Sequence, residues 1–263
     1  MILQRLATAL RKQDWFTVLI ETLIVVFGVF IGLQVNNWNE ARQRTAAAEQ
    51  YEERLREDLR QDAANFVFLR DYYRGALKAA EQAYDGLTGQ AEMTDAALIV
   101  AAFRASQYNW SERHRATFDE LVGSGNLELI RDPALRARAS GYYAMRLGDE
   151  VSQASMNSEY RRAFRLLAPP MLHAALGEQC GDRELGGPGI YTIDYECKFQ
   201  WPESEVAAFA STLRNDETVL PLLRLRIANL ASRDFELQSN FVYFGLEDLL
   251  PSGDTPGTDP DGD

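Results

Sequence analysis

Residues 21–43 read "ETLIVVFGVFIGLQVNNWNEARQ" and begin with a carboxylate, Glu21, inside a long apolar run. That run covers residues 16–35, and about 20 residues of α-helix reach roughly 30 Å, the apolar thickness of a bilayer. Glu21, Thr22 and Gln34 are its strongly polar members. The stretch therefore predicts a helix that crosses a membrane.

Two other interpretations of this helix fit the sequence less well. A buried core helix of a soluble domain rarely carries so long an apolar run. A cleaved signal peptide should end in small residues, whereas large polar residues follow this run and the first alanine cluster comes only at residues 46–48. Trp15 and Trp38 bracket the run, as aromatic residues do at membrane interfaces. We predict an uncleaved anchor over residues 16–38, surrounded by the lipid bilayer.

One face of this anchor carries three unusual residues. Glu21, Gly28 and Gly32 lie seven and then four positions apart, so they share a face. The Gly-x-x-x-Gly spacing lets two helix backbones approach closely in lipid, although glycine is common in spanning helices in any case. A carboxylate in a membrane usually faces a partner or water, but Glu21 is near enough to Trp15 to reach the interface. The face predicts a homo-oligomer or docking onto another membrane protein.

The charges flanking the anchor are nearly balanced. Three basic residues precede it and four follow it, namely Arg5, Arg11, Lys12, Arg42, Arg44, Arg54 and Arg56. The first helix usually sets the orientation, and a long domain crosses largely regardless of its charge. We therefore expect residues 1–15 to be a short cytoplasmic segment of a bacterial inner-membrane protein whose C-terminal domain faces the periplasm.

Composition excludes some partners and leaves the cysteines undecided. The 263-residue chain has a formal net charge of −12, which argues against nucleic acid because its phosphates need clustered Lys and Arg. The chain has two cysteines, Cys180 and Cys197, and they lack the CxxC spacing of a zinc site. In an oxidising compartment they could form a disulfide, whereas in the cytosol they would remain thiols.

Residues 39–250 predict one helical domain. Apolar residues at helical spacing run along residues 51–84, which is typical of a long amphipathic helix continuous with the anchor. The glycines of "YDGLTGQ" stop this helix, and a second helix is expected over residues 95–106. A third is expected over residues 111–122.

The second half of the domain continues this pattern. Asp132 before Pro133 is a strong start signal for a helix that can run to the following Pro-Pro pair. The alternating, aromatic "GIYTIDYECKFQW" allows a short β-hairpin near residues 190–201. A near-heptad pattern over residues 220–244 predicts a last long helix, and residues 251–263 read as an acidic disordered tail. The fold class is all-α, a transmembrane helix followed by a mostly antiparallel helical bundle.

Residues that could carry chemistry are few. The chain has two histidines and no Walker A, GxSxG, HExxH or GxGxxG motif. His114 lies among charged residues and is interpreted as solvated. The aromatic residues Trp110, Tyr142, Tyr143 and Trp201 could line a ligand pocket, although such residues are more often core. We expect no enzyme, no cofactor and no metal site.

Two stretches carry a family resemblance. The first is the anchor with its exit of amides around a tryptophan, "ETLIVVFGVFIGLQVNNWNEARQ", and the second is "TFDELVGSGNLELIRDPALRARASGYY". Both resemble the DUF6090 family of small bacterial single-span membrane proteins of unknown function. The resemblance implies a membrane anchor and supplies no activity.

Together these features predict a membrane-anchored interaction or scaffold protein that associates through its transmembrane face and its helical domain. The alternative is an exported ligand-sensing bundle. Because only residues 1–15 would lie on the cytoplasmic side, such a sensor would have to signal through a membrane partner.

Overall fold

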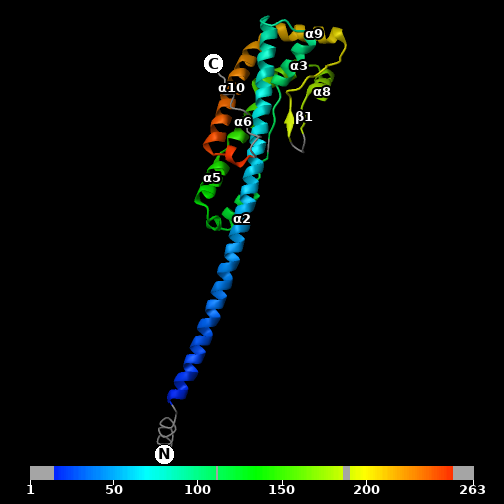
Figure 1. Cartoon of the computed structure of the whole chain (residues 1–263). Helices are drawn as coiled ribbons and strands as arrows, with labels where there is room; N and C mark the ends of the chain where they lie inside the picture. The colour runs from blue at the N-terminus through cyan, green and yellow to red at the C-terminus, as the bar shows by residue number, and fades with distance from the viewer. Residues whose placement is uncertain (1–14, 111, 186–189, 251–263) are drawn as a thin grey trace, which may run out of the picture. The chain divides into compact units, whose positions relative to one another are not determined.

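The computed structural model describes residues 15–110, 112–185 and 190–250. Helix α2 covers Trp15–Thr88 and joins the apolar stretch to the amphipathic stretch, as the sequence predicts (Figure 1). It ends where Gly89 adopts a φ of +74°. A left-handed residue after the last turn is a common helix stop, and glycine adopts it without a side-chain clash.

The chain divides into two compact units. The first comprises residues 1–53 and 128–131, and the second comprises residues 54–127 and 132–263. Within the first unit, the backbone N–H of Arg131 donates to the Glu52 carboxylate at 2.6 Å. The Arg131 guanidinium donates to the Thr45 hydroxyl at 2.8 Å. The boundary on α2 falls inside residues 39–250, which the sequence predicts to be one domain.

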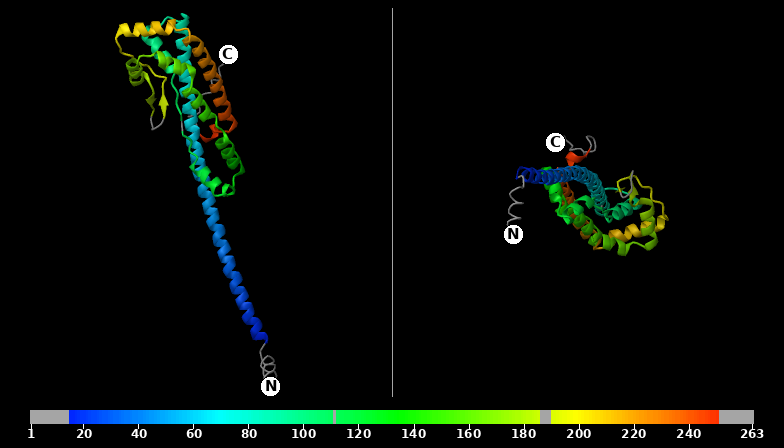
Figure 2. Two further views of the ribbon diagram at one scale, coloured as in Figure 1. Left: turned by 180° about the vertical axis from the view of Figure 1, so that it is seen from behind. Right: turned by 90° about the horizontal axis from the view of Figure 1, so that it is seen from below.

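The second unit is a helical bundle. After α2 it contains α3 (Asp95–Ala105), α4 (Ala116–Gly123), α5 (Pro133–Ala144), α6 (Leu147–Met156), α7 (Glu159–Leu167), α8 (Pro170–Cys180), α9 (Glu203–Asn215), α10 (Val219–Tyr243) and the 3₁₀ turn η2 (Glu247–Leu249). In this unit α10 lies on one side of α2, and α8 with the small sheet lies on the other (Figures 1 and 2). Phe66 stacks on Phe241 and Arg74 pairs with Asp234, so α2 and α10 run antiparallel.

The core of this unit follows the predicted stripe on α2. The buried apolar residues recur at helical spacing and are Leu55, Leu59, Ala63, Phe66, Leu69, Tyr73, Ala76 and Ala80. Facing helices add Phe103 and Phe164, whose ring centroids are 6.1 Å apart. Each fully buried Leu or Phe contributes roughly 1.5–3 kcal/mol of hydrophobic stabilisation, so this stripe favours the packing of α2 into the bundle.

The prediction of one long helix from Pro133 to the Pro-Pro pair is wrong. From Pro133 to the Pro-Pro pair the structure contains three helices, α5, α6 and α7. The chain becomes extended at Met145, whose carbonyl accepts a hydrogen bond from Arg113 Nη1 at 2.5 Å. Ser158 then starts α7 by accepting from the N–H of Arg161. A tertiary hydrogen bond and an internal N-cap therefore divide the helix without a proline.

Smaller differences concern segment ends. Helix α4 begins at Ala116 instead of residue 111, and the sequence did not predict α9. Strand β2 (Tyr191–Thr192) pairs antiparallel with β1 (Arg183–Glu184), so the hairpin is present but its first strand lies before residues 190–201. The predicted tail, residues 251–263, lies outside the described residues.

Candidate functional site

The apolar part of α2 lies on the surface of the structure. From Leu19 to Val35 its large apolar side chains are 39–65% exposed, and Trp38 is 65% exposed. Among the described residues, α2 is the helix long and apolar enough to cross a membrane, and none of its apolar window is buried. Soluble proteins rarely expose so long an apolar surface, which excludes a core helix of the described fold. The side chain of Trp15 lies outside the described side chains.

The predicted association residues share one open face of α2. Glu21 is exposed, and a methyl group added to Gly28 or Gly32 meets no atom within 4 Å. The described part of this chain therefore leaves space for a neighbour against both glycines. Because glycine has no side chain, a second helix can approach this face to backbone distance.

Polar side chains follow the apolar stretch at once. Asn36 Nδ2 donates to the Glu40 carboxylate at 2.7 Å, and the Thr45 hydroxyl donates to the carbonyl of Ala41 at 2.9 Å. Both bonds join residues four apart on one helix. The helix can therefore continue into water without a cap or a turn.

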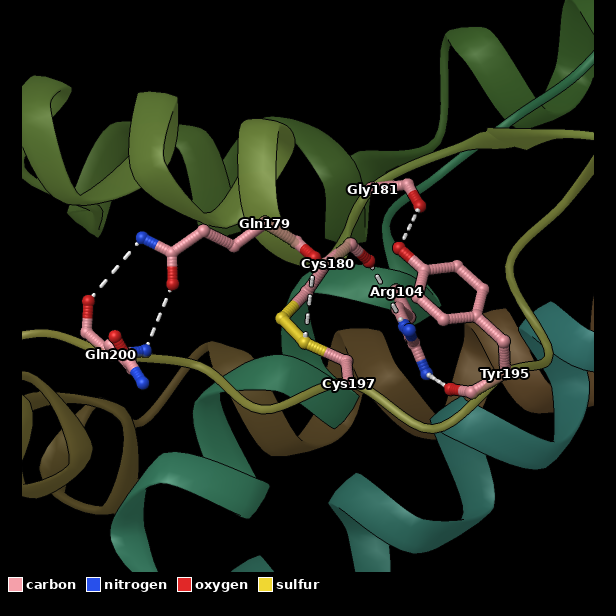
Figure 3. The surroundings of a disulfide bond; sticks show 7 residues. All are labelled: Arg104, Gln179, Cys180, Gly181, Tyr195, Cys197 and Gln200. Carbon is pink, nitrogen blue, oxygen red and sulfur yellow. Dashed lines mark hydrogen bonds between the residues drawn. A yellow bond between two sulfur atoms is a disulfide. The ribbon is translucent and has the colours of Figure 1, made fainter.

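Cys180 and Cys197 form a disulfide, with 5.5 Å between their Cα atoms (Figure 3). Cys180 is the last residue of α8 and is buried, whereas Cys197 lies in the irregular segment after β2 and is half-buried. The bond closes a loop across 17 positions of the chain. It ties the end of α8 to the segment that leads into α9.

Polar contacts around the disulfide hold the same two segments together (Figure 3). Arg104 on α3 donates through Nε to the carbonyl of Cys180 at 3.0 Å and through Nη1 to the carbonyl of Tyr195 at 2.9 Å. The Tyr195 hydroxyl donates to the carbonyl of Gly181 at 2.7 Å. The Arg104 guanidinium also lies over the Tyr195 ring, 4.4 Å from its centroid. The disulfide thus joins segments that neighbouring contacts already align.

His114 is exposed, as the sequence predicts, but it does not lie on a helix. It lies in the irregular segment before α4, and its backbone N–H and Nδ1 lie 2.7 Å and 3.0 Å from Oδ1 of Asp62. Asp62 is buried, and burial raises the pKa of its carboxyl. Tyr143 donates to the carbonyl of His114 at 2.7 Å. The sequence does carry one signal for this contact, because Asp62 is a charged residue inside the apolar stripe of α2. Its partner His114 lies 52 positions away, so the sequence does not identify the pair.

The four aromatic residues selected from the sequence do not form one pocket. Tyr142 and Tyr143 pack in the core, with 5.1 Å between their ring centroids. Trp201 donates to the Glu205 carboxylate at 2.9 Å. Trp110 is 59% exposed and lines a separate surface pocket. In the described part of the chain, no group of three or more His, Cys, Asp or Glu could hold a metal ion.

No family model, curated protein or solved structure matches this chain. The resemblance to the DUF6090 family remains a prediction from two stretches of sequence. Function is therefore inferred from this chain's own residues and geometry.

Proposed function

We propose that this protein is a single-pass interaction or scaffold protein anchored in a bacterial inner membrane. The observation that carries the proposal is the exposed apolar surface of residues 19–35, which water disfavours and lipid does not. A spanning segment must pair its backbone polar groups internally, and uninterrupted α2 does so. The resemblance to the DUF6090 family supports the same anchor.

The proposed orientation places residues 1–15 in the cytoplasm and the helical bundle in the periplasm. The Cys180–Cys197 disulfide supports it, because disulfides persist in oxidising compartments. Alkaline phosphatase fused to the C-terminus should be active, and a fluorescent protein that folds only in the cytoplasm should be dark. The opposite pair of signals contradicts this orientation. Mass spectrometry of the purified chain should find residues 1–15, whereas a product starting beyond residue 38 contradicts the anchor.

The proposed contact surface in the membrane is the face of Glu21, Gly28 and Gly32. Gly28→Ile should reduce crosslinked oligomers in membranes, because the added side chain separates two helices that meet at the glycines. Glu21→Leu should reduce them if the carboxylate faces the partner. Val26→Ile adds bulk on nearly the opposite side of the helix and is the matched control. Equal crosslinking in all variants contradicts this contact surface.

A second candidate function is an exported ligand-sensing bundle that signals through a membrane partner. One observation favours it, a surface pocket of about 300 Å³ beside Trp110. Both candidates are binding proteins without catalysis, in keeping with a sequence that carries none of the catalytic motifs considered above.

A further inference from the structure

A surface pocket of about 300 Å³ lies between α6 and the irregular segment that follows α3. Its lining residues are Tyr108, Trp110, Asp149, Ser152, Gln153 and Met156. The four residues from α6 are spaced by three, one and three positions, so they form one face of that helix. The volume is at the lower end of the roughly 300–1,000 Å³ typical of small-molecule sites.

The segment that carries the aromatic wall is irregular but firmly held. Arg226, a buried residue on α10, donates to the carbonyls of Ala105 at 3.1 Å and Gln107 at 2.9 Å. The hydroxyl of buried Tyr73 donates to the carbonyl of Asn109 at 2.7 Å. Buried side chains from α2 and α10 therefore fix the backbone that presents the pocket. A preorganised wall lowers the entropy lost when a ligand binds.

The aromatic side chains of this segment are positioned in different ways. Arg161 donates to the carbonyl of Ser106 at 2.7 Å, and its guanidinium lies over the Tyr108 ring, 4.7 Å from the centroid. The backbone N–H of Trp110 donates to the Asn109 side chain at 2.7 Å. The Trp110 side chain is nonetheless 59% exposed. An oriented backbone thus carries an indole with much of its surface available to a ligand.

The polar wall of the pocket carries little unpaired charge. Asp149 lies 2.5 Å from Arg113, and its side chain remains 54% exposed, so the carboxylate can still accept hydrogen bonds. Gln153 is exposed and offers both an amide donor and a carbonyl acceptor. The Arg161 guanidinium already lies over the Tyr108 ring, so a ligand cation on that ring would be repelled by a like charge. These features favour a ligand that is neutral, rich in hydroxyls and apolar on one face.

We propose that this pocket binds a neutral saccharide. The C–H face of a pyranose ring stacks on the Trp110 indole, and its hydroxyls bond to the Asp149 carboxylate and the Gln153 amide. The inference gives the second candidate function its ligand class and rests on that candidate for its biological role. The pocket lies in the second unit, whereas the apolar stretch of α2 belongs to the first. The binding test of the pocket is therefore separate from the tests of the anchor.

The test is calorimetric titration of the full chain in nanodiscs of phosphatidylethanolamine and phosphatidylglycerol. Nanodiscs of these lipids replace detergents with sugar or choline head groups, so the probes are the only sugars or choline in the sample. The probes are maltose, N,N′-diacetylchitobiose and choline chloride, each titrated through the millimolar range. Saturable binding of at least one disaccharide, and weaker or no binding of choline, is expected.

Variants locate the binding. Trp110→Ala should weaken disaccharide binding about tenfold, because it removes the stacking surface. Gln153→Ala should weaken it by a smaller factor. Phe235→Ala is the matched control, since it removes a 73%-exposed aromatic side chain of α10 outside the pocket lining and should leave binding unchanged. Circular dichroism checks that each variant retains its helices.

Three results overturn the proposal: neither disaccharide binds, Trp110→Ala binds as tightly as the wild type, or choline binds more tightly than both disaccharides. The last result assigns a cation site to the pocket instead. A failed titration leaves the reporter-fusion and crosslinking results unaffected. Failure of the saccharide site is therefore distinguishable from failure of the membrane-anchor proposal.

Discussion

At the residue scale, Arg226 illustrates how a buried cation is accommodated by neutral acceptors. Its guanidinium donates to the carbonyls of Ala105 and Gln107 and to the hydroxyl of Ser155. Burial lowers its pKa to about 10, so the side chain remains charged at neutral pH. A buried charge is tolerated when hydrogen bonds satisfy it, and its removal leaves the acceptors without donors.

We expect Arg226→Met to lower the free energy of unfolding by about 3 kcal/mol, because two carbonyls lose their donor in a buried site. Urea unfolding of the full chain in nanodiscs, followed by circular dichroism, measures the change. Arg162→Met is the control, since Arg162 is an exposed neighbour of Arg161 on α7 and should change stability by less than about 0.5 kcal/mol. Equal effects of the two substitutions would contradict a supporting role for Arg226.

Asp62 predicts a pH dependence of defined sign. Burial raises its pKa above the unfolded value of 3.8, so the folded state holds the proton more tightly. Its contribution to stability is therefore fully present below pH 3.8 and is lost as the pH rises through the folded pKa. Asp62→Asn does not titrate, so its stability relative to the wild type should increase between about pH 4 and pH 7. Urea unfolding at several pH values measures this difference.

Asp216→Asn is the control for that experiment, because it makes the same change in charge at a site that is only partly buried. The hydrogen bond from the Thr218 hydroxyl lowers the pKa of Asp216, so this carboxylate contributes stability above pH 3.8 that is lost as the pH falls. The variant should therefore lose stability relative to the wild type as the pH rises. A decrease for Asp62→Asn over the same range would show that His114, and not burial, controls the Asp62 carboxyl.

At the element scale, the ends of helices depend on local chemistry that short sequence patterns report well. Asp132 accepts from the N–H groups of Ala134 and Leu135, with Pro133 in the first position of α5, as the sequence predicts. The division between α5 and α6 escaped prediction because Arg113, from a distant segment, bonds to the Met145 carbonyl there. The start of α7 is a local N-cap at Ser158, which the sequence analysis did not single out. A local signal is therefore easiest to recognise where a proline accompanies the cap, as at Pro133.

The end of α2 provides a test at this scale. Gly89→Ala should destabilise the protein by about 1 kcal/mol, because alanine must adopt the left-handed conformation that glycine adopts freely. Gly123→Ala, within α4, meets no atom within 4 Å, has no positive φ, and should stabilise by up to about 1 kcal/mol. Thermal unfolding of both variants measures the two signs. Destabilisation by both substitutions would point to packing instead of backbone conformation.

At the scale of the whole molecule, the disulfide and the exposed apolar helix place different demands on the surroundings. The apolar surface of the helix favours lipid, and a disulfide persists in an oxidising compartment. The location proposed above, an inner membrane with the bundle in the periplasm, would meet both demands. The bundle would also gain stability from the cross-link, which restricts the unfolded chain.

Replacing both Cys180 and Cys197 by serine should lower the free energy of unfolding by about 3 kcal/mol, the value expected for a loop of this size. Urea unfolding with and without dithiothreitol measures the effect. Reductant should destabilise the wild type by a similar amount and leave the double variant unchanged. A wild type insensitive to reductant throughout its unfolding transition would contradict a stabilising disulfide.

The sequence alone determined the long helix, its apolar stretch, its end near Gly86 and Gly89 and the all-α class, because each depends on neighbours within a few residues along the chain. It also placed Glu21, Gly28 and Gly32 on one face, since helix geometry alone does so. Only the tertiary structure decided that Asp62 meets His114, that Arg226 holds the segment after α3, that the two cysteines pair, and that Trp110 lines a pocket. These contacts join residues distant in sequence, and their geometry is set by the packing of the whole bundle, which no short pattern encodes.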